Sequence, residues 1–299
     1  MKMISPVVRS ARFSALVITI LAAAIGVRAA DRLEESPVRV GDFGSIEYKL
    51  LLDLDGLSAE EPIEATLRRM GEQLDMMKVG ASAKHRLTAY VDTADRRLAG
   101  ANYILRVRGG RPSPASARVT LKGRWSSVER AVRLSGPGLR PSKHEIDVTG
   151  GRKVYSISYS VRLGGSECFP DGEMTGESLL KAIKKPNPAP GAHLESIIKD
   201  AELVVRPSAD HYSSWAKLKP GQVASAGEGG VDLDVDIMYF GTDRVVVELS
   251  YTRNAAAEKE AAALYRELME LLEKRGVLAK RQSTKTAAYL DHHYPSQTP

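Results

Sequence analysis

Ser45-Ile46-Glu47-Tyr48-Lys49-Leu50 is the stretch that decides the fold, because every second residue in it is apolar. On an extended chain Ile46, Tyr48 and Leu50 fall on one face, and Glu47 and Lys49 fall on the other. This period of two predicts a β-strand with one apolar face and one charged face. The charged face carries both signs, so its residues can pair with neighbouring strands or bind a charged ligand.

The same alternation of apolar and charged residues returns at several later places in the chain. It is compatible with a half-solvated antiparallel sheet, or with a sheet closed into a barrel whose charged face lines a tunnel. Several strands, few helices and no strand–helix–strand alternation favour an antiparallel β-barrel of the α+β class, with helices packed on its outside. The charged positions are Arg106 and Arg108, Arg118 and Lys122, Glu145 and Asp147, and Asp232, Asp234 and Asp236.

The remaining pattern predicts one domain over residues 30–299, with an insert at about 164–200 that breaks the strand rhythm. Helices are expected at 62–78 and 255–275, and short helical pieces at 178–185 and 193–200 inside the insert. Strands are expected at about 44–53, 85–93, 102–109, 117–123, 128–134, 142–148, 153–163, 201–206, 211–218, 231–239 and 243–251.

The first residues of the chain predict a signal peptide over positions 1–29. A basic leader precedes an apolar run at 13–27, and Val27-Arg28-Ala29 places small residues where a signal peptidase cleaves. The run is shorter than the roughly 20 apolar residues that a transmembrane helix needs. We therefore expect cleavage, no stable membrane anchor afterwards, and export to the periplasm or out of the cell.

Cleavage would change the charge of the protein. The leader holds four basic residues and no acidic one, so the formal net charge falls from +6 to +2. A mature chain so close to neutrality is not a globally basic nucleic-acid binder, and nucleic acid is not an expected partner. Cys168 is the single cysteine, which excludes an internal disulfide and a thiolate metal cluster.

Common catalytic signatures are absent from the sequence: it contains no GxxxxGK[ST], GxGxxG, HExxH or GxSxG motif. His292-His293 lies in a polar tail, where we expect no structure and no site. Any chemistry must therefore come from the alternating charges.

The order of these charged motifs resembles the CYTH superfamily, the triphosphate tunnel metalloenzymes. Its members include thiamine triphosphatases, inorganic tri- and polyphosphatases and class IV adenylyl cyclases. The resemblance spans residues 44–290 and rests on order and spacing, since each motif is short. The motifs are Glu47 with Lys49, Tyr90–Thr93 with Arg97-Leu98, Tyr103–Arg108, Thr120–Lys122, Glu145–Asp147, and Glu248 before a long helix.

The resemblance implies roles for ten residues around a triphosphate and its metal. Cations hold phosphoryl oxygens, and carboxylates hold a hard divalent ion, Mg²⁺ or Mn²⁺. Glu47, Lys49 and Lys122 are the implied catalytic residues. The implied substrate-binding residues are Lys49, Arg106, Arg108, Lys122, Arg206 and Lys285, and the implied metal ligands are Glu47, Glu145, Asp147 and Glu248.

Two departures from the family pattern remove carboxylates. Ser45 stands where the opening ExExK motif has its first Glu, and Ser250 stands at the second of two late acidic positions. The aspartates at 232, 234 and 236 would compensate if they faced the tunnel, but a solvated strand face is the expected arrangement. The departures weaken the implied metal site.

We therefore expect metal-dependent hydrolysis of inorganic triphosphate or short polyphosphate outside the cytoplasm. The alternative is a non-catalytic module that binds triphosphate or polyphosphate beside a degenerate metal site. A third possibility is a barrel adaptor that binds no phosphate. Cyclase activity is disfavoured, because ATP is not expected in that compartment.

Overall fold

The computed structural model describes residues 40–109, 116–134, 140–164, 174–185, 188–241 and 244–293. The predicted signal peptide at 1–29 and residues 165–173 of the predicted insert lie outside these ranges. No helix of the described ranges is long and apolar enough to cross a membrane.

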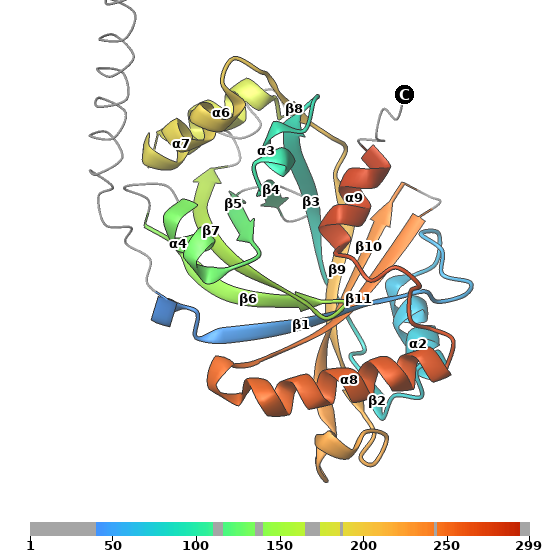
Figure 1. The fold of residues 1–299 in the computed structure, drawn as a ribbon. Coiled ribbons are helices and arrows are strands. Elements are labelled where there is room, and N and C mark those ends of the chain that lie inside the picture. Colours follow the sequence, from blue (N-terminus) through green and yellow to red (C-terminus); the bar gives the residue numbers. More distant parts are fainter. Residues whose placement is uncertain are drawn as a thin grey trace, which may run out of the picture.

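A single eleven-stranded sheet closes into a barrel through nine of its strands (Figure 1). The ring runs β9-β10-β11-β1-β6-β7-β5-β4-β3 and is closed by the pairing of β3 with β9, while β2 and β8 attach outside it. This confirms the predicted α+β barrel. The strands are β1 (Ser45–Leu52), β2 (Lys78–Val79), β3 (Lys84–Thr93), β4 (Tyr103–Gly109), β5 (Ser116–Trp125), β6 (Lys143–Thr149), β7 (Arg152–Gly164), β8 (Leu203–Val205), β9 (Ala209–Leu218), β10 (Val231–Phe240) and β11 (Arg244–Asn254).

One pairing departs from the expected antiparallel arrangement. β1 lies between β11, its antiparallel partner, and β6, to which it runs parallel with Glu47 opposite Asp147. Parallel neighbours need a long connection, and here the connection includes β2 to β5 and spans residues 53–142. The barrel is therefore mixed, and the parallel pair places two predicted metal ligands side by side.

The outward faces of the strands form the main apolar core under the helices. α8 (Glu258–Lys274) lies against β1 and β11 (Figure 1), where Tyr48 stacks on Tyr251 with ring centroids 5.2 Å apart. Tyr265 of α8 donates a hydrogen bond from its hydroxyl to the Lys49 carbonyl oxygen at 3.1 Å. This packing fixes β1, so that Glu47 and Lys49 point to the inside.

The other helices lie around the barrel and at one end of it (Figure 1). α6 and α7 form a helical pair in the insert, and Pro188 and Pro190 lie in the first turn of α7, where a missing N–H costs no helical hydrogen bond. The helices are α2 (Ile63–Gln73), α3 (Arg97–Gly100), α4 (Val128–Leu134), α6 (Gly176–Lys184), α7 (Pro188–Ile198) and α9 (Lys285–His293), with short 3-10 helices η1 (Val40–Asp42), η2 (Ala224–Ala226) and η3 (Ala255–Ala257).

The strand predicted at 128–134 is wrong, because this segment forms helix α4. Ser127 caps its start by accepting a hydrogen bond from the Arg130 N–H at 3.3 Å. Val128, Ala131 and Val132 recur at helical spacing, and Ala131 is fully buried. In a segment of only seven residues, the strand period of two and the helix period of 3.6 cannot be told apart. The serine cap then favours the helix.

The expectation of an unstructured tail around His292-His293 is also wrong. Residues 285–293 form α9, which contacts β3, β10 and β11. Tyr289 packs on Tyr90 and Phe240 in a small apolar cluster separate from the main core. Tyr90 lies opposite Arg106 in the β3–β4 pairing, so this cluster belongs to the same inward face as the charges. α9 therefore closes part of one end of the barrel interior.

Candidate functional site

Nine of the ten residues with predicted roles line one cavity of about 380 Å³ inside the barrel or lie in direct contact with its lining. The charged positions of the strands alternate with outward apolar residues, as the sequence predicts, and so face the lumen. The lining includes Glu47, Lys49, Arg106, Arg108, Lys122, Glu145, Lys285 and, not predicted, Asp236; Asp147 and Glu248 lie just behind it, paired to Lys49 and Lys285.

Three carboxylates form a compact cluster at the junction of β1 and β6. Glu47, Glu145 and Asp147 each offer an oxygen, and these atoms all lie within 4.8 Å of one another. The parallel register that sets Glu47 opposite Asp147 brings them together. Three hard oxygen donors at this spacing suit a divalent ion such as Mg²⁺ or Mn²⁺, so the donor set fits the metal that the family pattern implies.

Two buried lysines pair with the carboxylates of this cluster. Lys49 Nζ lies 2.9 Å from Glu47 Oε2 and also contacts Asp147. Lys122 Nζ lies 2.5 Å from Glu145 Oε1 and 2.9 Å from Asp147 Oδ2. Buried charges of opposite sign stabilise one another only at such close range. The two lysines offset two of the three negative charges, and Arg124 and Lys143 also contact Asp147 and Glu145.

The pairs shift the pKa values of Glu145, Asp147 and Lys49. Burial favours the neutral form of Glu145, yet the neighbouring Lys122 outweighs it and lowers the pKa of that carboxyl to about 2. Burial also opposes ionisation of Asp147, but Lys122 and Lys49 hold its pKa well below the usual range. The pKa of Lys49 is raised against burial, chiefly by Asp147. These groups are all charged at neutral pH.

The β4 wall of the cavity carries cations that no carboxylate balances. Within the described ranges Arg106 and Arg108 make no ion pair, and the buried Nε atom of each has no hydrogen-bond partner. Burial, reinforced by Arg106, lowers the pKa of Arg108 to about 9, so the side chain stays charged at neutral pH. Half-buried arginines that make no ion pair with the described carboxylates have N–H donors available for an anion.

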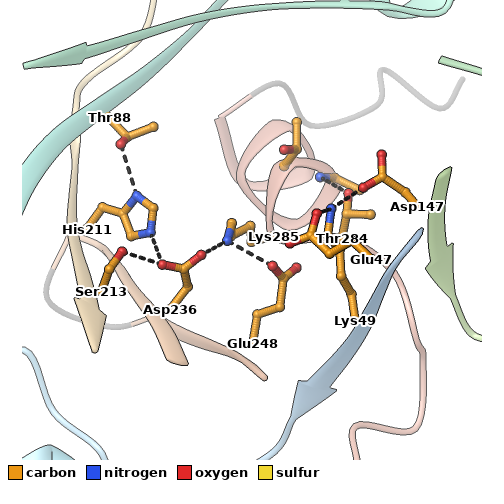
Figure 2. Close-up of polar contacts among 12 residues, drawn as sticks. Glu47, Lys49, Thr88, Asp147, His211, Ser213, Asp236, Glu248, Thr284 and Lys285 are labelled. Carbon is orange, nitrogen blue, oxygen red and sulfur yellow. Dashed lines mark hydrogen bonds and ion pairs between the residues drawn. The ribbon is translucent and has the colours of Figure 1, made fainter. Parts of the chain in front are cut away.

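A second charged group forms around Asp236 and joins β9, β10 and β11 (Figure 2). Lys285 Nζ contacts Asp236 and lies 2.8 Å from Glu248 Oε1. Glu248 is only 1% exposed, and the β10–β11 register places it opposite Asp236. Glu248 was predicted with the other metal ligands, but the structure pairs it with Lys285, outside the three-carboxylate cluster.

His211 and Ser213 hold Asp236 in place from β9 (Figure 2). His211 Nε2 lies 2.9 Å from Asp236 Oδ1, and its Nδ1 lies 3.2 Å from the Thr88 hydroxyl. Burial lowers the pKa of His211 to about 4 despite the neighbouring carboxylate. The neutral ring therefore donates from Nε2 to Asp236 and accepts from Thr88.

The expectation of a solvated face over 232–236 is wrong at its last position. Asp232 and Asp234 are exposed, but Asp236 enters the lumen. The sequence feature that could have predicted this is the apolar run after Asp236. Ile237 to Phe240 are all buried and continue the strand into the interior.

Three more positions singled out from the sequence are Ser45, Ser250 and Arg206. Ser45 and Ser250 share the inward alternation of Glu47 and Glu248, so the lumen lacks carboxylates at both places. Arg206 follows β8 and does not line this cavity; together with burial and His292, its charge lowers the pKa of His293. We therefore leave Arg206 out of the proposed site.

Comparisons with known proteins give weak similarities. No family model matches the chain, and no curated protein matches it. One solved structure with similarity is a protein from Hippeastrum, described as a candidate adenylyl cyclase with a dominant triphosphatase activity; it shares 14% identity over 84% of this chain and 96% of its own, with a TM-score of 0.41. Another is a candidate adenylate cyclase from Bacillus halodurans, with 14% identity, coverage of 83% and 97%, and a TM-score of 0.40. Similarity this low supports no argument, so the architecture rests on the strand pairing itself.

Proposed function

We propose that this protein is a metal-dependent phosphohydrolase that acts on inorganic triphosphate or short polyphosphate. The observation that carries the proposal is the presence of Arg106 and Arg108, unbalanced by any described carboxylate, in the same cavity as the Glu47, Glu145 and Asp147 cluster. A cationic wall facing a carboxylate cluster suits an anion that arrives with a divalent metal. The order of the motifs, similar to the CYTH pattern, supports the same substrate class.

The arginines would hold the phosphoryl oxygens. A guanidinium presents several N–H donors in a plane and binds phosphate through two of them at once. Lys49 and Lys122 contact the carboxylates and line the same cavity as the arginines. When a phosphate chain enters, each lysine can donate to it without leaving its carboxylate, because an ammonium group has three N–H donors.

Glu47, Glu145 and Asp147 would hold Mg²⁺ or Mn²⁺, which neutralises charge on the phosphoryl group when bound. Glu47 is the most accessible of the three, with 22% of its side chain exposed. Its pair with Lys49 uses Oε2, so Oε1 is the acceptor for a proton of the attacking water. Arg108 and Lys122 then stabilise the charge on the transferred and leaving phosphates.

The location outside the cytoplasm is part of the proposal and rests on the predicted signal peptide. Nucleotide and thiamine triphosphates are scarce there. This location favours an inorganic phosphate chain over a nucleotide as the substrate.

A second candidate function is triphosphate or polyphosphate binding without hydrolysis. It is favoured by the cations that already contact the carboxylate cluster, with which a metal must compete: Lys49, Lys122, Arg124 and Lys143. The serines at 45 and 250 remove two carboxylates that would strengthen the metal site. If Ser45→Glu with Ser250→Glu creates turnover that the natural chain lacks, the binding module is the better description.

The test follows phosphate release from tripolyphosphate with Mg²⁺, with Mn²⁺ and with chelator. We expect turnover that requires metal and that falls at least about a hundredfold in Glu47→Gln and in Arg106→Gln. Arg253→Gln, an exposed arginine on the outside of β11, is the matched control and should retain the activity.

Thermal unfolding of the same proteins separates the alternatives. Lack of turnover together with a clear rise of Tm on adding tripolyphosphate would support the binding module. Absence of both turnover and stabilisation would contradict the proposed substrate class and leave only the barrel adaptor.

A further inference from the structure

The cavity that contains the arginines is one of three that meet inside the barrel. A narrow cavity of about 40 Å³ shares Arg106, Lys122 and Lys285 with it. The narrow cavity in turn shares Arg124 and Thr284 with a third, open cavity of about 640 Å³. The narrow cavity therefore borders both of the others, and the third cavity reaches the start of α9 through Thr284 and Ala287.

The third cavity is strongly basic. Its lining includes Arg124, Arg152, Lys280 and Arg281, against one acidic residue, Asp147. Asp147 is already paired with Lys49 and Lys122. Within the described ranges Arg152, Lys280 and Arg281 make no ion pair, so this end of the lumen has an excess of positive charge.

The loop that carries Lys280 and Arg281 is fixed to the barrel. The side chain of Gln282 accepts a hydrogen bond from the Leu51 N–H at 2.9 Å and donates one to the Leu51 carbonyl at 2.9 Å. Leu278 pairs with Leu52 in an isolated bridge. The two cations are therefore held at this opening by β1, the strand that also carries Glu47 and Lys49.

We propose that the third cavity is an anion subsite that binds the far end of a linear polyphosphate chain. The chain lies against Arg106 and Arg108, passes the narrow cavity and reaches Arg152 and Arg281. This inference rests on the proposed function and makes it more specific: the preferred substrate is a chain longer than triphosphate.

The narrow cavity limits what can pass. Its 40 Å³ has room for about three water molecules, by the ~10–15 Å³ that each requires. An unbranched chain of phosphates is thin along its whole length and presents charge to the basic lining at every unit. A nucleoside is wide and mostly uncharged, so it stays outside the narrow part.

The test measures binding by calorimetry with the purified protein in chelator, so that hydrolysis does not interfere. The probes are long-chain polyphosphate, tripolyphosphate and orthophosphate. The variant is the double charge reversal Arg152→Glu with Arg281→Glu, at two exposed positions outside the proposed catalytic machinery. The matched control is Lys259→Glu with Lys274→Glu, which makes the same change of net charge on exposed positions of α8.

We expect the cavity variant to weaken binding of long-chain polyphosphate about tenfold relative to the control, which corresponds to about 1.4 kcal/mol. Binding of tripolyphosphate should change no more than in the control. Equal losses for the two probes, equal losses in the two variants, or an orthophosphate site that is lost in the cavity variant would each overturn the proposal. The proposed hydrolysis fails separately, through absence of metal-dependent phosphate release from tripolyphosphate.

Discussion

The charged residues on two walls of the lumen differ in whether they form ion pairs. On the wall of β1 and β6 the carboxylates of Glu145 and Asp147 are paired with Lys122 and Lys49. On the β4 wall Arg106 and Arg108 have no described ion-pair partner. A paired charge stabilises the folded protein, whereas an unpaired buried charge costs stability until a ligand neutralises it. We therefore expect the wall of β1 and β6 to contribute mainly to stability and the β4 wall to contribute mainly to anion affinity.

The largest effect is expected from breaking the paired wall. Lys122→Met leaves Glu145 and Asp147 with less compensation and should lower the free energy of unfolding by about 3–5 kcal/mol, the usual cost of breaking a buried pair. Urea unfolding measures it. Lys143→Met is the matched control, because Lys143 pairs with the same Glu145 from a position where 59% of its side chain is exposed. The control should lose about 0–1 kcal/mol, and equal losses would contradict the division between the walls.

The next effect concerns pH and His211, whose ring donates a hydrogen bond to Asp236. Its pKa is lowered from 6.5 to about 4 by burial, so between these values the unfolded chain takes up a proton that the folded chain does not. The stability contribution is present above pH 6.5 and is lost as the pH falls toward 4, by on the order of 3 kcal/mol.

This pH dependence is checked by urea unfolding of wild type and His211→Gln between pH 7 and pH 4. Whatever its stability at pH 7, the variant should give a flatter curve over that interval. Parallel curves would show that the ring does not remain neutral in the folded protein.

Removing a cation from the unpaired wall should have the opposite consequence for stability. Arg108→Gln is expected to leave Tm unchanged or slightly higher, because it removes a buried charge without a partner. Affinity for tripolyphosphate should fall by about 10- to 150-fold, the equivalent of one hydrogen bond between charged groups at about 1.5–3 kcal/mol. Calorimetry and thermal unfolding test both parts, with Arg253→Gln as control. A large loss of stability would mean that Arg108 is structural.

The smallest effect is expected for metal alone. Because Lys49 and Lys122 already occupy oxygens of the carboxylate cluster, Mg²⁺ without phosphate should raise Tm by less than about 1 °C. Tripolyphosphate at a hundred times its Kd should stabilise by about 2.7 kcal/mol, or roughly 5–10 °C for a domain of this size. Differential scanning calorimetry compares the two ligands, separately and together. A larger shift with Mg²⁺ alone would show that the lysines do not compete with metal.

The local pattern of the sequence predicts most of the strands and the inward direction of their charges. Alternation around Glu47 and Glu145 is a property of neighbouring residues, and it survives in the structure. Alternation does not predict which of those charges pair with one another, because the pairing depends on the parallel register of β1 and β6. Nothing in either strand alone specifies which strand lies beside it.

The parts that the sequence pattern missed depend on distant neighbours. Residues 285–293 lack a long apolar run, and their helix is stabilised where Tyr289 meets Tyr90 and Phe240 from two other strands. Asp236 resembles Asp232 and Asp234 in its alternation, and it differs from them in lying next to the buried run that begins at Ile237 and opposite the buried Glu248. Tertiary contacts of this kind override local propensity.

The position of β1 in the ring has a consequence for how the protein is made. Its antiparallel partner is β11, with Ser45 opposite Asn254, so the seam between them joins residues more than two hundred positions apart. Contacts of such long sequence separation form late and slowly. The ribosome must therefore deliver nearly the whole chain before the ring can close, and until then β1 presents an open edge to any other strand it meets.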